Sequence, residues 1–103
     1  GGISEEYRIA QYADDHSIQF VPNGWNTAIG LVADLQLVAA TANTQWVEYI
    51  TPAPYIEELL ANPIALDDDG CISIPDGPGL GMEWNPDGIA KFTRGMKLTS
   101  SSL

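Results

Sequence analysis

Residues 18 to 50 constrain the fold of this chain more than any other stretch, because two short apolar runs flank a long apolar helix pattern. The runs are Ile18–Pro22 and Trp46–Ile50, and the pattern between them predicts a helix from Ala28 to Thr41. Apolar side chains lie all around this helix, so it needs cover on more than one side. Strands joined by a crossover of this length lie parallel, normally with a right-handed connection. The stretch therefore predicts a parallel strand–helix–strand unit from the interior of an α/β protein.

Local signals set the expected ends of two helices. Asn26 or Thr27 can cap the start of the long apolar helix, and Asn43 can close its end in a left-handed conformation. Near the start of the chain Ser4 is a suitable N-cap, and two glutamates follow it where the helix dipole favours negative charge. Apolar residues at helical spacing then carry this first helix to about Asp15.

The chain changes character near Thr51, and this is the expected boundary between residues 1–50 and a C-terminal extension, residues 51–103. The extension should begin with about two turns of helix at 55–61, followed by a half-exposed strand at 71–75. It should end with a short helix capped by Asn85, with Pro86 at its first position, and a frayed tail at 99–103.

The composition is strongly acidic: 14 acidic residues against 4 basic ones give a formal charge of −10. A chain this acidic repels phosphate backbones and anionic lipid, so we expect no nucleic-acid or membrane-surface binding. No apolar run approaches the roughly 20 residues that a membrane helix needs, and no signal-peptide pattern opens the chain. The single cysteine, Cys71, cannot form an internal disulfide, which favours a reducing compartment. We therefore expect a cytoplasmic location.

Three motifs suggest chemistry but are better explained as ordinary structure. The acidic run Asp67–Gly70 resembles a calcium loop, yet Ala65 stands at its first ligand position, so an acidic hairpin turn is the better interpretation. The glycine-rich segment Gly77–Gly81 is not followed by a helix N-terminus, which argues against a phosphate loop. Nothing in the sequence supports His16 and Cys71 as a nucleophilic couple, and His16 is expected at the surface.

Glu48 is the most unusual residue of the apolar runs, because it interrupts a strand that should be apolar throughout if both its faces are buried. A buried carboxylate is costly, so Glu48 must face a polar cavity, pair with a cation or lie on an exposed strand face. Asn23 and Trp25 directly follow the first apolar run, at the carboxyl end of a strand, where parallel α/β proteins bind ligands. The alternative for Asn23-Gly24 is a simple turn.

Four blocks of the sequence resemble, in order and spacing, the C-terminal end of the enolase superfamily. The resemblance is to the mandelate racemase and muconate lactonizing enzyme family, with its sugar-acid dehydratase branch, and it extends to about residue 93. The blocks are Gly1–Glu5, Val21–Trp25, Trp46–Tyr49 and Ile74–Gly81. It implies that residues 1–50 form the last helices and strands of a (β/α)7β TIM-like barrel. Residues 51–103 would then be the extension that packs on the N-terminal capping domain.

The resemblance also implies a chemistry, that of a metal-dependent racemase or dehydratase acting on a hydroxy acid or sugar acid. In that family a divalent metal, usually Mg²⁺, stabilises the enediolate formed when a base removes the proton next to a carboxylate. The metal ligands belong to strands absent from this chain, so it should bind no metal itself. Glu48 corresponds to a glutamate that hydrogen-bonds the substrate carboxylate, for which it would need to be protonated.

Asn23 corresponds to a position that usually carries a histidine base, and here the chain departs from the family. Asparagine cannot take up a proton near neutral pH, so Asn23 is expected to orient the substrate instead. Trp25 is a further expected substrate contact.

The chain is too short for a complete barrel, which takes about 250 residues. A two-stranded unit with an all-round apolar helix would expose large hydrophobic faces. We therefore expect either that a missing N-terminal part of the same protein covers them, or that the chain forms a homo-oligomer. Alone it should be inactive. The alternatives are a non-catalytic, self-associating α/β module and a family member that lost its histidine base.

Overall fold

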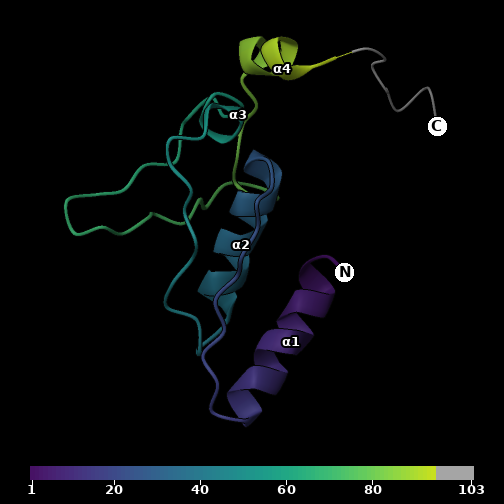
Figure 1. Ribbon diagram of the computed structural model, residues 1–103, viewed down its shortest axis with the longest axis vertical. Helices are drawn as coiled ribbons and strands as arrows, with labels where there is room; N and C mark the ends of the chain where they lie inside the picture. Colours follow the sequence, from purple (N-terminus) through teal and green to yellow (C-terminus); the bar gives the residue numbers. More distant parts are fainter. Residues whose placement is uncertain (95–103) are drawn as a thin grey trace.

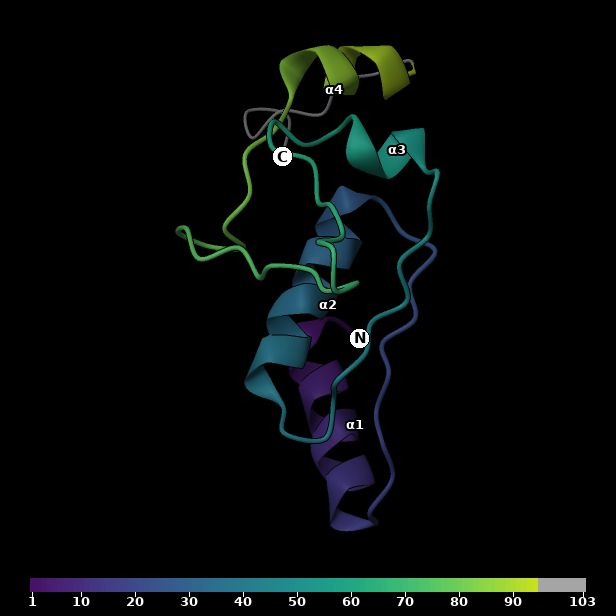
Figure 2. The same cartoon turned by 90° about the vertical axis from the view of Figure 1, so that its left-hand side faces the viewer.

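The computed structural model describes residues 1–94 and, within them, contains four α-helices (Figure 1). They are α1 (Ile3–Asp15), α2 (Ala28–Ala40), α3 (Pro54–Glu57) and α4 (Pro86–Phe92). Helices α1 and α2 pack side by side and run in the same direction, because an extended segment returns the chain between them (Figures 1 and 2). The frayed tail expected at 99–103 lies outside the described residues. None of the helices in the described part of the chain has the length and apolar character to span a bilayer.

The start of α1 differs from the expected one. The helix begins at Ile3 with Gly2, rather than Ser4, at the N-cap position. Gly2 has a φ of 78°, which glycine adopts without steric cost, and its carbonyl accepts the amides of Glu5 and Glu6, both at 3.1 Å. The prediction of Ser4 as the cap was therefore wrong, because the glycine carbonyl already takes the first helical hydrogen bonds.

The end of α1 forms a Schellman motif. Ser17 is left-handed with a φ of 56°, and its amide donates to the carbonyl of Asp14 at 2.9 Å. The next amide, of Ile18, donates to the carbonyl of Ala13 at 2.8 Å. These two bonds satisfy carbonyls that a helix end leaves free, and they turn the chain into the first extended segment.

Asn43 does not close α2 in a left-handed conformation, so that prediction was wrong. The helix ends at Ala40, and Thr41 is already extended, with a φ of −123°. The Asn43 side chain instead donates to the carbonyls of Ala10 at 2.9 Å and Ile18 at 3.2 Å. The Asn43 side chain thus links α1 to the first extended segment. The residue with a left-handed backbone conformation in this region is Ser17.

At its other end α2 begins as expected after Thr27, which occupies the N-cap position. The Thr27 side chain, however, makes no capping hydrogen bond. The Asn26 side chain packs under Gly30, where an added Cβ would lie 2.4 Å from the Asn26 Cβ.

The two apolar runs at 18–22 and 46–50 are extended and run parallel to each other (Figure 2). Neither forms a regular β-strand, so the prediction of strands at these residues was wrong. The amide of Glu48 donates to the carbonyl of Pro22 at 3.4 Å. Pro22 has no amide of its own to donate, and a pair of strands without further neighbours is only marginally stable. The two segments therefore lie side by side without a regular ladder.

Residues 71–75 also lack a regular strand, contrary to expectation, and pair only through a single antiparallel bridge between Ile72 and Leu66. The acidic turn between them is as predicted. The Asp67 carboxylate accepts hydrogen bonds from the amides of Asp69 at 3.0 Å and Cys71 at 2.8 Å, and these bonds close the turn.

Helix α3 is shorter than the two turns expected at 55–61. Leu60 bridges to Trp84, and the amide of Ala61 donates to the carbonyl of Glu83 at 2.9 Å, so these residues pair with the returning chain instead of continuing the helix. Helix α4 agrees with its local signals, because Pro86 is its first residue and the Asn85 side chain accepts the amide of Asp87 at 3.2 Å.

The hydrophobic core lies between the first half of α2 and the segment around α3. Its buried members are the following residues: Ala28, Leu31, Val32, Ala53, Ile56, Leu59 and Leu60. The core thus contains residues from both sides of Thr51, and the domain boundary there stays a prediction. Farther along α2, Gln36 donates its amide to the carbonyls of Pro75 at 2.6 Å and Leu80 at 3.2 Å, which anchors the glycine-rich loop to the helix.

The molecule is open for its size. Its radius of gyration is 15.2 Å, whereas a compact domain of 100 residues has a value of about 13 Å. The apolar surface is correspondingly uncovered, since Tyr12 is 68% exposed, Trp46 66% and Trp25 79%.

Candidate functional site

The structure brings Asn23 and Glu48 into direct contact. The Nδ2 amide of Asn23 donates a short hydrogen bond to Oε2 of Glu48, 25 residues farther along the chain. The backbone sets up this contact, because the hydrogen bond from the Glu48 amide to the Pro22 carbonyl aligns the two extended segments one residue before Asn23. Both polar residues lie toward the carboxyl ends of their segments.

The pair lies on the face that points away from α2. Side chains alternate along an extended segment, and Val47 and Tyr49 pack against the core while Trp46 and Glu48 are exposed. On the other segment Pro22 is buried, whereas its neighbour Asn23 is exposed. Of the three environments expected for Glu48, the exposed face agrees best with the structure, although the segment that carries it is extended chain and not a strand.

The chemistry of the pair follows from its donors and acceptors. An asparagine amide has two N–H donors and one oxygen acceptor, and here one donor is used on Oε2 of Glu48. The second carboxylate oxygen of Glu48 and the rest of the Asn23 amide can therefore face a ligand. Neither ion pair within residues 1–94 involves Glu48, since these are Arg8–Glu5 and Lys91–Glu58.

Trp25 is not brought into this pair by the structure. Its exposed ring lines an open groove of about 540 Å³ at the start of α2, and neither Asn23 nor Glu48 lines that groove. The other lining residues are Asn26, Thr27, Ile29, Gly30 and Tyr55. A substrate contact by Trp25 stays a prediction.

His16 and Cys71 make contacts that do not involve each other. The Nδ1 atom of His16, the residue that follows α1, lies 2.9 Å from the carbonyl oxygen of Tyr12, and the two rings are tilted by 40° with centroids 4.4 Å apart. Cys71 is exposed in the acidic hairpin. Within residues 1–94, no group of three or more His, Cys, Asp or Glu side chains is placed to hold a metal ion.

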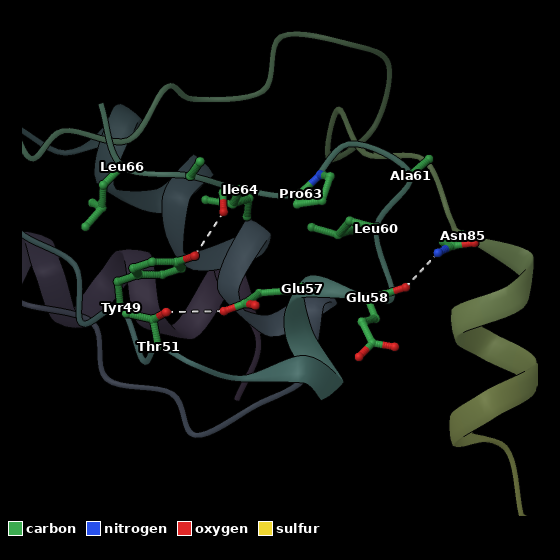
Figure 3. Close-up of a pocket in the computed structure, with 11 residues that line it drawn as sticks. Tyr49, Thr51, Glu57, Glu58, Leu60, Ala61, Pro63, Ile64, Leu66 and Asn85 are labelled. Atoms are coloured by element: carbon green, nitrogen blue, oxygen red, sulfur yellow. Dashed lines mark hydrogen bonds between the residues drawn. The ribbon is translucent and has the colours of Figure 1, made fainter. Parts of the chain in front are cut away.

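A second concave region lies between Thr51, α3 and residues 60–66, and it has a volume of about 630 Å³ (Figure 3). The Tyr49 hydroxyl donates to the carbonyl of Ile64 at 2.9 Å, and the Thr51 hydroxyl donates to Oε1 of Glu57 at 3.3 Å. Burial, followed by the nearby charge of Glu57, raises the pKa of Tyr49 above its ordinary value. Sequence reasoning missed this groove, because its walls come together only through the packing of α3.

Asp34 is a functional candidate that the sequence reasoning also missed. It is the only ionisable residue of α2 and is 7% exposed, so burial raises the pKa of its carboxyl group, with Glu6 as a second cause. The available signal was a lone aspartate in an otherwise apolar helix, which indicates a buried carboxyl group.

Comparison with known proteins assigns the chain to a family. Residues 1–88 match the family described as Enolase C-terminal domain-like. The chain is 37% identical to D-galactarolactone cycloisomerase of Agrobacterium fabrum over 101 residues, which is 89% of this chain and 26% of that protein. It is 35% identical to muconate cycloisomerase 1-1 of Acinetobacter lwoffii over 96 residues, which is 91% of this chain and 25% of that protein.

A solved structure gives the same result for the fold. The mandelate racemase/muconate lactonizing enzyme from Jannaschia sp. CCS1 superposes with a TM-score of 0.79 at 26% identity, covering 95% of this chain and 25% of that one. The chain therefore spans about a quarter of the length of the curated relatives and of this structure. By sequence and by fold, the chain belongs to the enolase superfamily and corresponds to its C-terminal portion.

Proposed function

We propose that the chain is the C-terminal part of a racemase- or dehydratase-like enzyme that removes the proton next to a carboxylate in a hydroxy acid or sugar acid. The contact between Asn23 and Glu48 carries this proposal, because it places two polar side chains together on the face away from α2. The names of the two cycloisomerase relatives support an isomerase or lyase reaction on a small carboxylate. The single cysteine supports a cytoplasmic location for the parent protein.

Glu48 is the proposed electrophilic partner. As a neutral acid it would donate its O–H to the substrate carboxylate, where negative charge grows as the neighbouring proton leaves. Asn23 is the proposed orienting residue, and its amide holds Oε2 of Glu48 so that the other oxygen faces the substrate. Because neither an amide nor a neutral acid can accept the proton, the base must come from another part of the protein.

The family also implies a divalent metal, Mg²⁺, in the parent enzyme. The described residues do not fit such a site, since none of their His, Cys, Asp and Glu side chains form a group of three or more suited to a metal. We therefore assign the metal ligands to the rest of the parent protein.

Kinetics of the full-length parent would test the proposed roles. We expect Glu48→Ala to lower kcat about 100- to 1,000-fold, the usual cost of removing one donor from developing charge, and Glu48→Gln to retain more activity because its amide can still donate. The matched control is Glu83→Ala, an exposed glutamate on a different segment. A Glu48→Ala enzyme as active as this control on every acid substrate would exclude Glu48 from the site.

A double-mutant cycle would test the role of Asn23. If Asn23 acts by holding Glu48, then the double variant Asn23→Ala, Glu48→Ala will be no slower than Glu48→Ala alone. If the double variant instead loses activity by the product of the two single losses, then Asn23 contacts the substrate independently of Glu48. Restoring histidine at Asn23 tests the loss of a base, because a gain in turnover would identify a protein that lost its histidine.

The exposed aromatic residues favour a second candidate, a self-associating module without catalysis. Trp25, Trp46 and Tyr12 are all more than half exposed, and a monomer would leave them in water. Light scattering of the chain alone, and then with the missing N-terminal part supplied in trans, separates the two candidates. A stable homo-oligomer that does not exchange for the N-terminal part would favour the module, whereas a 1:1 complex would favour the enzyme fragment.

A further inference from the structure

Two backbone hydrogen bonds within residues 1–94 set the register of the two parallel extended segments (Figure 2). The amide of Phe20 donates to the carbonyl of Asn43 at 3.3 Å, and the amide of Glu48 donates to the carbonyl of Pro22 at 3.4 Å. In a regular parallel ladder that starts from the first of these bonds, the carbonyl of Pro22 accepts the amide of Val47. Because the observed donor is the next residue, the second segment contains one residue more than the first between the two bonds.

The exposure of the side chains indicates where the extra residue lies. In the first segment the side chains alternate without a break, since buried Pro22 stands between exposed Val21 and exposed Asn23. In the second segment the alternation breaks once, because the neighbours Gln45 and Trp46 are both exposed. An extra residue that interrupts the alternation of one segment only is a β-bulge, and the bulge here is formed by Gln45 and Trp46.

Pro22 explains why the second segment can hold an extra residue at this place. In the regular ladder the amide of residue 22 would donate to the carbonyl of Gln45, but proline has no amide hydrogen. The bond that would fix Gln45 against the first segment therefore cannot form. The second segment can bulge at Gln45 without losing a hydrogen bond to the first, and Pro22 itself is buried.

The bulge decides which residue stands opposite Asn23. In a parallel pair, the residue whose amide donates to the carbonyl just before Asn23 lies directly opposite Asn23, and that residue is Glu48. Without the bulge Val47 would take this place. Glu48 would then turn toward α2, because a shift of one residue exchanges the two faces of an extended segment. The hydrogen bond between the Asn23 and Glu48 side chains therefore depends on the bulge.

We propose that Pro22 is a positioning residue that acts through this bulge. By withholding an amide it lets the second segment hold one more residue, which places the carboxyl group of Glu48 beside Asn23. The placement depends on the backbone contacts alone, whereas its effect on catalysis rests on the function proposed above for Glu48. We therefore test placement and catalysis separately.

Disulfide cross-linking of the 103-residue chain, with Cys71→Ser to remove the native thiol, measures the register. Cysteines that lie directly opposite each other are close enough to join. We expect a cross-link when Asn23→Cys is combined with Glu48→Cys, and its loss when Asn23→Cys is combined with Val47→Cys, the matched control. Proteolysis at Asp34, which lies between the two positions, followed by mass spectrometry identifies the product. Equal products at positions 47 and 48, or a dominant product at 47, would overturn the proposal.

Two changes shift the register. Deleting Gln45 removes the extra residue, so the cross-link from Asn23→Cys should move from position 48 to position 47. Gln45→Ala, the matched control, keeps the number of residues and should keep the product at 48. Pro22→Val supplies the missing amide and should raise the share of the product at 47. An unchanged share in Pro22→Val would overturn the role of Pro22, and this variant decides alone if the deletion variant does not fold.

Kinetics of the full-length parent tests the effect on catalysis. Deleting Gln45 should lower kcat by as much as Glu48→Ala does. Adding the exchange Val47→Glu, Glu48→Val to the deletion should recover kcat, because it returns a carboxyl group to the position opposite Asn23. The same exchange without the deletion is the control and should stay inactive.

Recovery of kcat separates positioning from a merely structural role of the bulge, since an enzyme that is only destabilised does not regain activity through this exchange. If Glu48→Ala itself leaves kcat unchanged, the proposed function fails, while the cross-links still decide the register. In an enzyme that needs Glu48, a deletion variant that the exchange does not rescue would overturn the positioning role.

Discussion

The side chain of Asn43 donates a hydrogen bond to the carbonyl of Ala10, 33 residues earlier, at a distance of 2.9 Å. A second bond from the same nitrogen, to the carbonyl of Ile18, joins the start of the first extended segment to the same side chain. One asparagine thus links the end of α1, the beginning of the next segment and the turn after α2.

Replacing Asn43 should therefore destabilise the fold. We expect Asn43→Ala to lower the free energy of unfolding by about 1–3 kcal/mol, because two carbonyls lose their donor and Ala10 is fully buried. Urea unfolding followed by circular dichroism gives the value. Asn62→Ala, an exposed asparagine in a loop, is the control, and equal effects of the two changes would contradict the proposed link.

Ser17→Gly should stabilise the chain. Ser17 has a φ of 56°, and a left-handed conformation costs a residue with a Cβ about 1–2 kcal/mol relative to glycine. Part of this gain is lost through the greater freedom of glycine in the unfolded chain, so we expect a net increase of up to about 1 kcal/mol in thermal unfolding experiments. Ser4→Gly, within α1, is the control and should destabilise the chain, because glycine is unfavourable inside a helix. A destabilising Ser17→Gly would mean that the Schellman motif is absent in solution.

Gly88→Ala should detach α4 from the rest of the molecule. Gly88 is buried, and a Cβ there would lie 1.9 Å from the carbonyl oxygen of Glu58 and 2.8 Å from its carbon, which are backbone atoms that cannot turn aside. We expect faster amide hydrogen exchange at residues 87–92 of α4, with little change in α2. Lys91→Ala removes the partly exposed ion pair to Glu58, worth at most about 1 kcal/mol, and the contact of the Lys91 ammonium group with the Phe92 ring. It should leave α4 protected. Protection of α4 in Gly88→Ala would contradict the close packing.

The pH dependence at the alkaline end should reveal Tyr49. Its pKa is raised by burial and then by Glu57, so the phenol of the folded chain resists ionisation. The stability it contributes is complete below the ordinary value of 10.0 and is lost as the pH rises through the raised pKa. Tyr49→Phe removes the hydrogen bond to the Ile64 carbonyl, so it should lower the free energy of unfolding by about 1 kcal/mol near pH 8. Above pH 10 the difference between the variant and the original chain should be smaller. Urea unfolding at both pH values measures this difference, and Tyr12→Phe, at an exposed tyrosine, is the control. A difference in unfolding free energy between Tyr49→Phe and the original chain that grows with pH would contradict the prediction.

Local signals predicted much of the fold. The apolar length of α2, the Asn85–Pro86 start of α4 and the acidic turn at Asp67 each depend on residues close in sequence, and the structure has all three. The strand predictions were wrong because the pairing of a strand depends on neighbouring strands elsewhere in the fold. Likewise, no local rule decides whether Asn43 turns the chain itself or reaches across to Ala10.

The candidate site divides in the same way. Asn23 was identified because it directly follows the first apolar run, and Glu48 because it interrupts the second; the family resemblance pointed to both. The contact between their side chains emerged only in three dimensions. Asp34 was visible as a polar residue in an apolar helix, but its position under Gly24 depends on how residues 22–26 cross α2.

The two hydrogen bonds from Gln36 to the carbonyls of Pro75 and Leu80 have a consequence for synthesis on the ribosome. They close loops of 39 and 44 residues, so the donor is made well before either acceptor. At about 5–20 residues per second, α2 waits roughly 2–9 seconds for the segment that anchors to it. During that interval the apolar surface of α2 has no partner from the glycine-rich loop.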